Sequence, residues 1–84
     1  MKRKFTEYRV IQIDDVNIGE NIKSLREEQG LKQTEVVRQL QLLGVDISVY
    51  SYNRIEKGTQ NSTVSFLLGI CEILGCNMDK IFGM

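Results

Sequence analysis

Side chains able to perform acid–base, nucleophilic or metal chemistry are few in this sequence, and their spacing is unfavourable. The chain has no histidine, and its two cysteines, Cys71 and Cys76, are separated by four residues. Two thiols without a histidine make a poor zinc site, so we expect both cysteines to be small buried residues and no metal to bind. The sequence has no recognisable pairing of a nucleophile with a base and no glycine-rich phosphate loop. It therefore indicates neither an enzyme nor a protein with a cofactor or small-molecule substrate.

The segment VDISVYSYNRIEKG, residues 45–58, raises a different question. Its first half is rich in strand-forming residues, whereas its second half is typical of the end of a helix. The neighbouring segments all read as helices, so a helix that begins after Ser48 and ends at Gly58 fits better than an isolated strand. In such a helix Tyr52 and Ile55 face inwards. The outward positions are then held by Val49, Tyr50, Asn53 and Arg54.

Four further helices are predicted from apolar residues at helical spacing between polar caps and glycines. The first runs from about residue 18 to 29 behind the capping pair Asn17 and Glu20, and the second covers residues 33–43. Helix 63–74 is capped by Ser62 or Thr63, and a short helix capped by Asn77 follows. The expected buried face of helix 63–74 consists of Val64, Leu67, Leu68, Ile70, Cys71 and Leu74. This pattern predicts an all-α domain over residues 17–84.

Residues 1–16 form an extension of different character. FTEYRVIQI, residues 5–13, reads as a strand, which is either a flexible leader or a strand that pairs with its copy in a second subunit. Phe66, Gly69 and Ile73 are predicted to form an exposed stripe that either makes a dimer contact or seats the N-terminal segment. The candidate dimer-contact residues are Tyr8, Val10, Ile11, Ile13, Phe66, Gly69 and Ile73. The start MKRK is either a solvated basic end or an arm that reaches phosphates.

The length and the charge of the chain limit the number of domains and the classes of partner that can be expected. The chain has 84 residues and equal numbers, 11 each, of basic and acidic residues. One small domain is expected, with no apolar run long enough to cross a membrane. The basic start is not followed by an apolar segment typical of a signal peptide, so we expect a cytoplasmic protein. A net charge of zero is mild evidence against a nucleic-acid partner, although the distribution of charge matters more than its sum.

Three motifs, IGENIKSLREEQGLKQTEVV, RIEKG and NSTVSFLLGICEILGCNMDKIF, resemble the XRE family of Cro and phage-repressor helix-turn-helix proteins. The resemblance covers residues 17–82. It implies a five-helix, lambda-repressor-like domain whose recognition helix, residues 48–57, lies in the major groove of double-stranded DNA. By resemblance, bases would be read by Val49, Tyr50, Asn53 and Arg54. Phosphates would be contacted by Gln33, Ser51, Lys57 and Asn61.

The resemblance also gives these residues chemical roles. Arg54 can make a bidentate contact with guanine, and Val49 can touch a thymine methyl group. Asn53 either pairs with adenine or faces a phosphate. Arg26 and Glu56 match a family pair that joins the first and recognition helices, and we expect a salt bridge between them. The alternative to a base-reading role for Arg54 is that it is an ordinary solvated charge on the surface.

Two departures from the family pattern are evident. Lys32 stands where the family usually has a capping Ser or Thr, so Thr34 could start the second helix later. The turn before the recognition helix, GVDI, residues 44–47, is longer than usual and could rotate that helix.

The resemblance implies a sequence-specific DNA-binding transcriptional regulator, a repressor that binds a pseudo-palindromic operator as a homodimer. The alternative is a protein-interaction module of the same fold, such as an antitoxin or a phage-type accessory protein, for which DNA binding is secondary. A positive face around Gln33, Arg54 and Lys57 would favour DNA.

Overall fold

The computed structural model of the chain describes residues 9–10 and 17–83. Five helices follow one another: α1 (Ile18–Glu28), α2 (Gln33–Leu42), α3 (Val49–Lys57), α4 (Val64–Leu74) and α5 (Met78–Phe82). Two short strands, β1 (Arg9–Val10) and β2 (Ser62–Thr63), complete the described elements. The all-α domain and its five predicted helices are confirmed. In the described residues, no helix is long and apolar enough to span a membrane.

The helices begin and end where local hydrogen bonding is favourable. The side chains of Asn17, Ser48, Thr63 and Asn77 each accept a hydrogen bond from a backbone N–H three residues later, at 2.9–3.1 Å. These bonds satisfy N–H groups that the first helical turn leaves unpaired. α2 lacks such a side-chain cap. There the Glu35 carboxylate instead accepts the Lys32 backbone N–H at 2.8 Å, so the helix begins at Gln33 and not later at Thr34.

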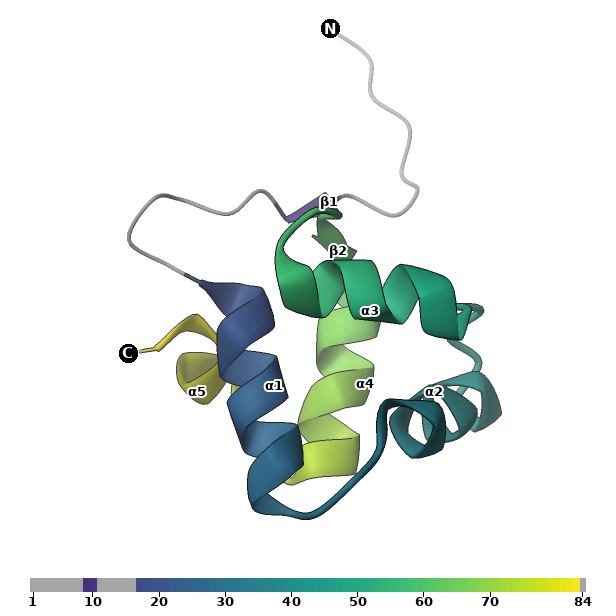
Figure 1. Cartoon of the computed structure of the whole chain (residues 1–84), viewed down its shortest axis with the longest axis horizontal. Helices are drawn as coiled ribbons and strands as arrows, with labels where there is room; N and C mark the ends of the chain where they lie inside the picture. The colour runs from purple at the N-terminus through teal and green to yellow at the C-terminus, as the bar shows by residue number, and fades with distance from the viewer. Residues whose placement is uncertain (1–8, 11–16, 84) are drawn as a thin grey trace, which may run out of the picture.

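One core joins all five helices around α4 (Figure 1). Tyr52 of α3 and Phe66 of α4 pack at its centre with ring centroids 5.8 Å apart. The fully buried or nearly buried core residues are Ile18, Ile22, Val36, Val37, Leu40, Tyr52, Ile55, Phe66, Leu67, Ile70, Leu74 and Ile81. The inward positions predicted for Tyr52 and Ile55 are therefore confirmed.

The predicted burial of α4 is correct for Leu67, Ile70 and Leu74 but wrong for the residues beside them. Phe66 is 1% exposed and Gly69 is buried, whereas Leu68 and Val64 are exposed. A Cβ atom on Gly69 would lie 2.8 Å from Leu40 Cδ2, because α2 packs closely over this side of α4. Phe66, Gly69 and Ile73 were expected to form an exposed stripe. Phe66 and Gly69 instead face the core, and Ile73 is half-buried.

The described part of the predicted N-terminal strand pairs within the chain. β1 runs antiparallel to β2, with Arg9 opposite Thr63 and Val10 opposite Ser62. Neither reading of the strand, as a flexible leader or as a strand paired with a second subunit, anticipated this partner. The dimer-contact candidates Tyr8, Ile11 and Ile13 and the basic start lie outside the described residues.

Gly19 in the first turn of α1 sets the distance between α1 and α3. A Cβ atom at this position would collide with the backbone carbonyl groups of Ile55 and Glu56 at the end of α3. Only glycine lets the two backbones approach so closely. This role of Gly19 was not predicted from sequence, although a glycine inside a helix is a signal of close approach.

We expect Gly19→Ala to lower the melting temperature. In an unobstructed helix, alanine would be favoured over glycine by up to about 1 kcal/mol. Here overpacking against a backbone costs about 1–3 kcal/mol, and each kcal/mol corresponds to about 4–8 °C in a domain of this size. Thermal unfolding followed by circular dichroism measures the effect. Ser24→Ala, at an exposed position of α1, is the control and should not lower the melting temperature. An unchanged or higher value for Gly19→Ala would contradict the close-approach role.

Candidate nucleic-acid interface

α3 lies across the end of the helical bundle with one face on the core and one face outward (Figure 1). Ser48 and Gly58, which has a left-handed backbone with φ of 80°, delimit this helix as predicted. The connection from α2 is held by a 2.9 Å hydrogen bond from Val45 N to Leu40 O. Gln41 Nε2 also donates to Ile47 O at 2.9 Å. These bonds fix the long turn, and the role of Gln41 in it was not predicted from sequence.

A buried ion pair attaches α3 to α1. Arg26 Nε donates to Glu56 Oε2 at 2.7 Å, and Arg26 Nη2 donates to Glu56 Oε1 at 3.1 Å. The two side chains are only 10% and 2% exposed. Arg26 Nη1 also donates to Leu31 O at 2.8 Å, which ties in the loop between α1 and α2. The salt bridge expected between Arg26 and Glu56 is present, with bidentate geometry.

The charge of this pair is stabilised by its neighbours. Burial alone would raise the pKa of Glu56, but hydrogen bonds from Arg26 and Gln33 outweigh burial and leave its pKa below the ordinary value. The hydrogen bond to Glu56 likewise raises the pKa of Arg26. Burial, followed by the nearby Glu56 carboxylate, raises the pKa of Tyr52. The Tyr52 hydroxyl has no hydrogen-bond partner within the described part of the chain.

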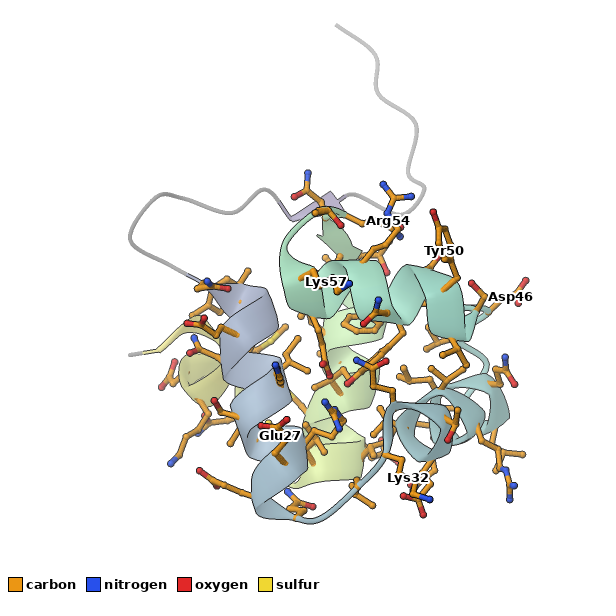
Figure 2. All side chains as sticks on the ribbon, viewed as in Figure 1. Glu27, Lys32, Asp46, Tyr50, Arg54 and Lys57 are labelled. Carbon is orange, nitrogen blue, oxygen red and sulfur yellow. The ribbon has the colours of Figure 1, made fainter. Side chains whose placement is uncertain are left out.

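The outward face of α3 carries the residues expected to read bases. Tyr50 is 71% exposed and Val49 is 40% exposed, while Arg54 is partly exposed. Figure 2 shows Tyr50 and Arg54 projecting together from the outer side of α3. The Arg54 guanidinium carbon lies 5.6 Å from the centre of the Tyr50 ring, within range of a cation–π interaction. Asn53 is turned towards α2, where its side-chain oxygen accepts a hydrogen bond from Gln33 Nε2 at 3.2 Å.

The residues expected to contact phosphates fall into two places. Gln33 and Lys57 line a hollow of about 270 Å³ that Lys23 also borders, at the junction of α1, α2 and α3. Ser51 and Asn61 line another hollow, of about 230 Å³, between the turn, α3 and the start of α4. Lys23 was not predicted from sequence, because it lies on α1, outside the motif that contains Lys57.

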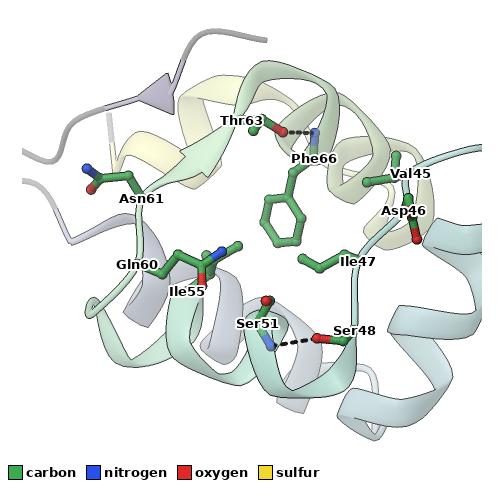
Figure 3. A pocket seen from close by; sticks show the side chains of 10 residues that line it. All are labelled: Val45, Asp46, Ile47, Ser48, Ser51, Ile55, Gln60, Asn61, Thr63 and Phe66. Carbon is green, nitrogen blue, oxygen red and sulfur yellow. Dashed lines mark hydrogen bonds between the residues drawn. The ribbon is translucent and has the colours of Figure 1, made fainter.

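The second hollow has an apolar floor. Figure 3 shows Phe66 pointing into it from α4 and Ile47 facing Phe66 from the turn. The Ser51 backbone N–H is already used to cap α3, because it donates to Ser48 Oγ at 3.1 Å. Polar side chains such as Ser51 and Asn61 lie at the edge of this hollow, and the core residues Ile55 and Phe66 form its interior.

The accessible charge of α3 is positive. The helix contains Arg54, Glu56 and Lys57 as its charged residues. Glu56 is buried and neutralised by Arg26, so Arg54 and Lys57 contribute the charge that faces solvent. A chain with no net charge thus has a locally positive helix surface, which suits contact with phosphate groups.

The two cysteines lie at the far end of α4. Both are free and half-buried, and Cys76 N donates to Cys71 O at 3.0 Å around the end of the helix. Burial, with a smaller effect of Cys76, raises the pKa of the Cys71 thiol, which lowers its reactivity. Within residues 17–83 no three metal-ligating side chains of the Cys, His, Asp or Glu type gather in one place.

The low pKa of Glu56 predicts a specific loss of stability in acid. Because folding lowers this pKa, the stabilisation from ionised Glu56 is complete above its ordinary value of 4.5 and is lost as the pH falls through the folded value. Glu56→Gln should cost about 3 kcal/mol or more of unfolding free energy at pH 7, because Arg26 is left buried without its partner. At about pH 3 the difference between the two proteins should shrink.

Urea denaturation at both pH values measures this difference. Glu27→Gln is the matched control, since Glu27 is 3.9 Å from Arg26 Nη2 but its side chain is 58% exposed. That substitution should have little effect at either pH. A Glu56→Gln deficit that stays constant from pH 7 to pH 3 would disprove the assignment.

The comparisons with known proteins agree with this arrangement. None of the curated proteins compared with the chain matches it. The family model described as a helix-turn-helix domain matches residues 17–80, which include all five helices except the end of α5. That range covers most of the chain and includes α2, the turn and α3. The chain therefore belongs to the helix-turn-helix domain family, which makes DNA the partner indicated for it.

Proposed function

We propose that this protein is a sequence-specific transcriptional repressor of the XRE or Cro type, with α3 as its recognition helix. The observation that carries the proposal is the division of α3 into two faces. Tyr52, Ile55 and Glu56 fix the helix to the rest of the domain, while Tyr50 and Arg54 project together from its exposed side. A rigidly held helix with exposed aromatic and guanidinium groups suits the major groove of DNA.

The roles of the individual side chains follow from their exposure. Arg54 is held by a weak, 3.4 Å contact of Nη2 with Thr59 O and by the Tyr50 ring, so little must be broken before it reaches a guanine. Val49 offers an apolar contact for a thymine methyl group. Lys57 and Lys23 border the same hollow, which Glu20 also lines, and the two lysines provide positive charge for the DNA backbone.

Arg54→Ala should abolish the preference for guanine at one position of the selected DNA sequence and so weaken binding to that site. A bidentate arginine–guanine contact contributes about 1–3 kcal/mol of discrimination. The experiment selects a binding site from random duplexes with the wild-type protein and measures affinity by fluorescence anisotropy at two salt concentrations. Arg38→Ala is the matched control, because Arg38 is exposed on α2. If the wild type selects no sequence, or if the two variants behave alike, the proposed role of α3 is refuted.

We further propose that the repressor acts as a homodimer through an apolar surface formed by Leu42, Leu43, Leu68 and Ile73, the α2–α4 face. Leu42 is 80%, Leu68 57% and Leu43 45% exposed. These residues line two adjoining hollows that share Leu43 and Glu72. An apolar surface of this kind on a small domain favours association with another protein surface. A dimer would present two copies of α3 to successive major grooves of a pseudo-palindromic operator.

The same surface supports the second candidate function, a protein-interaction module that binds a different protein. Leu68→Glu should convert a wild-type dimer into a folded monomer in sedimentation equilibrium. Val64→Glu, at an exposed position on the same helix outside both hollows, should leave the dimer intact. A wild type that is monomeric at all concentrations and on DNA would reject the homodimer and leave the α2–α4 face to another protein.

A further inference from the structure

The side-chain amide of Gln33 is fully engaged as a donor inside the protein. Its Nε2 atom donates to Glu56 Oε1 at 2.9 Å and to Asn53 Oδ1 at 3.2 Å. A primary amide nitrogen has two hydrogens, so these two bonds use both. Gln33 therefore has no side-chain hydrogen left to donate to a phosphate, in contrast to the role expected from sequence.

The direction of these bonds follows from the buried ion pair. Glu56 receives two hydrogen bonds from Arg26 and is held ionised, and an ionised carboxylate can only accept. The Gln33 atom that faces Glu56 must therefore be the nitrogen, since an amide oxygen there would be repelled. The same nitrogen faces Asn53, so the Asn53 atom that meets it must be the oxygen.

Asn53 is consequently oriented by its neighbours. Its Oδ1 atom is engaged with α2, and its Nδ2 group makes no hydrogen bond to any residue from 17 to 83. The order of donation is Arg26 to Glu56, Gln33 to Glu56, and Gln33 to Asn53. Arg26 on α1 thereby determines, through Glu56 and Gln33, that the nitrogen of the Asn53 amide is the end left to bind DNA.

We propose that Gln33 is a positioning residue that makes Asn53 a hydrogen-bond donor towards DNA, so that Asn53 selects guanine or thymine over adenine. This inference rests on the proposed function of α3. Bidentate recognition of adenine needs both the oxygen and the nitrogen of the amide, because adenine presents one acceptor and one donor. An amide that can only donate suits the acceptors guanine N7 and O6 and thymine O4, whereas at adenine it meets the N6 donor beside the N7 acceptor. The inference replaces the adenine contact expected for Asn53 from sequence.

The test begins with the DNA site that the wild-type protein selects from random duplexes. Asn53→Ala identifies the base pair that Asn53 reads, as the position at which preference is lost. Duplexes carrying each of the four bases there are then compared by anisotropy competition for the wild type and Gln33→Ala. Ser24→Ala is the control, because Ser24 is exposed on α1 and lines neither the hollow beside α3 nor the α2–α4 face.

The wild type and Ser24→Ala should prefer guanine or thymine over adenine at this position by about fivefold or more, as expected for loss of one good base contact. Gln33→Ala should reduce that ratio to about one or reverse it, because the freed amide can turn to pair with adenine. The salt dependence of DNA binding by Gln33→Ala controls for a change in phosphate contacts, and its melting temperature controls for folding. Should Gln33→Ala unfold, Gln33→Met keeps the side-chain length without the amide.

The outcomes separate this inference from the proposed function. If the wild type selects a site but has adenine at the Asn53 position, or if Gln33→Ala leaves the base ratio unchanged, the inference is overturned while DNA recognition by α3 stands. If Asn53→Ala relaxes no position of a selected site, Asn53 reads no base and the inference fails in the same way. Only a wild type that selects no sequence overturns both.

Discussion

The pairing of Arg26 with Glu56 is the contact on which the position of α3 depends. It joins the last turn of α1 to the last turn of α3, and its two further partners, Leu31 O and Gln33, bring in the loop before α2 and the start of α2. Removing two charges from water costs about as much as their attraction returns. The pair therefore contributes chiefly by specifying geometry, since any other placement of α3 would leave a buried charge without a partner.

Close backbone approach and side-chain packing act with this pair. Gly19 lets the start of α1 touch the end of α3, and Tyr52 packs on Phe66 beneath the helix. The inner face of α3 is thus held by three different kinds of contact at separate points. A helix held in this way can place exposed side chains reproducibly, which is the requirement for reading base edges in a groove.

The sequence predicted the helices well because their ends are encoded locally. A polar cap such as Ser48 and a left-handed glycine such as Gly58 act within one turn, so no tertiary information is needed. The burial of α4 was predicted only in part, because this helix is apolar on nearly all sides. Its inward face depends on where α2 and α3 press against it, as Phe66 and Gly69 show. The pairing of the N-terminal strand with β2 was not predicted, because Ser62 and Thr63 were interpreted only as possible caps of the following helix.

The site was predictable to a smaller extent. Residue types and resemblance led to Tyr50 and Arg54, whose exposure agrees with a surface role, but the orientation of Asn53 depends on hydrogen bonds between residues 20 and 30 positions apart. Lys23 and Gly19 belong to α1, outside the motif, and only the folded chain brings them to α3.

The Gln33–Asn53 contact has a consequence for how proteins of this design diverge. Tyr50 and Arg54 interact mainly with each other at the surface, so mutation can exchange them one at a time without disturbing the core. Asn53 tolerates substitution less well, because its amide is hydrogen-bonded to Gln33 and, through Gln33, is linked to the ion pair. If Asn53 has the proposed role, positions 33 and 53 should therefore evolve as a unit, because replacing only one of them would lose base selectivity before a new preference is gained.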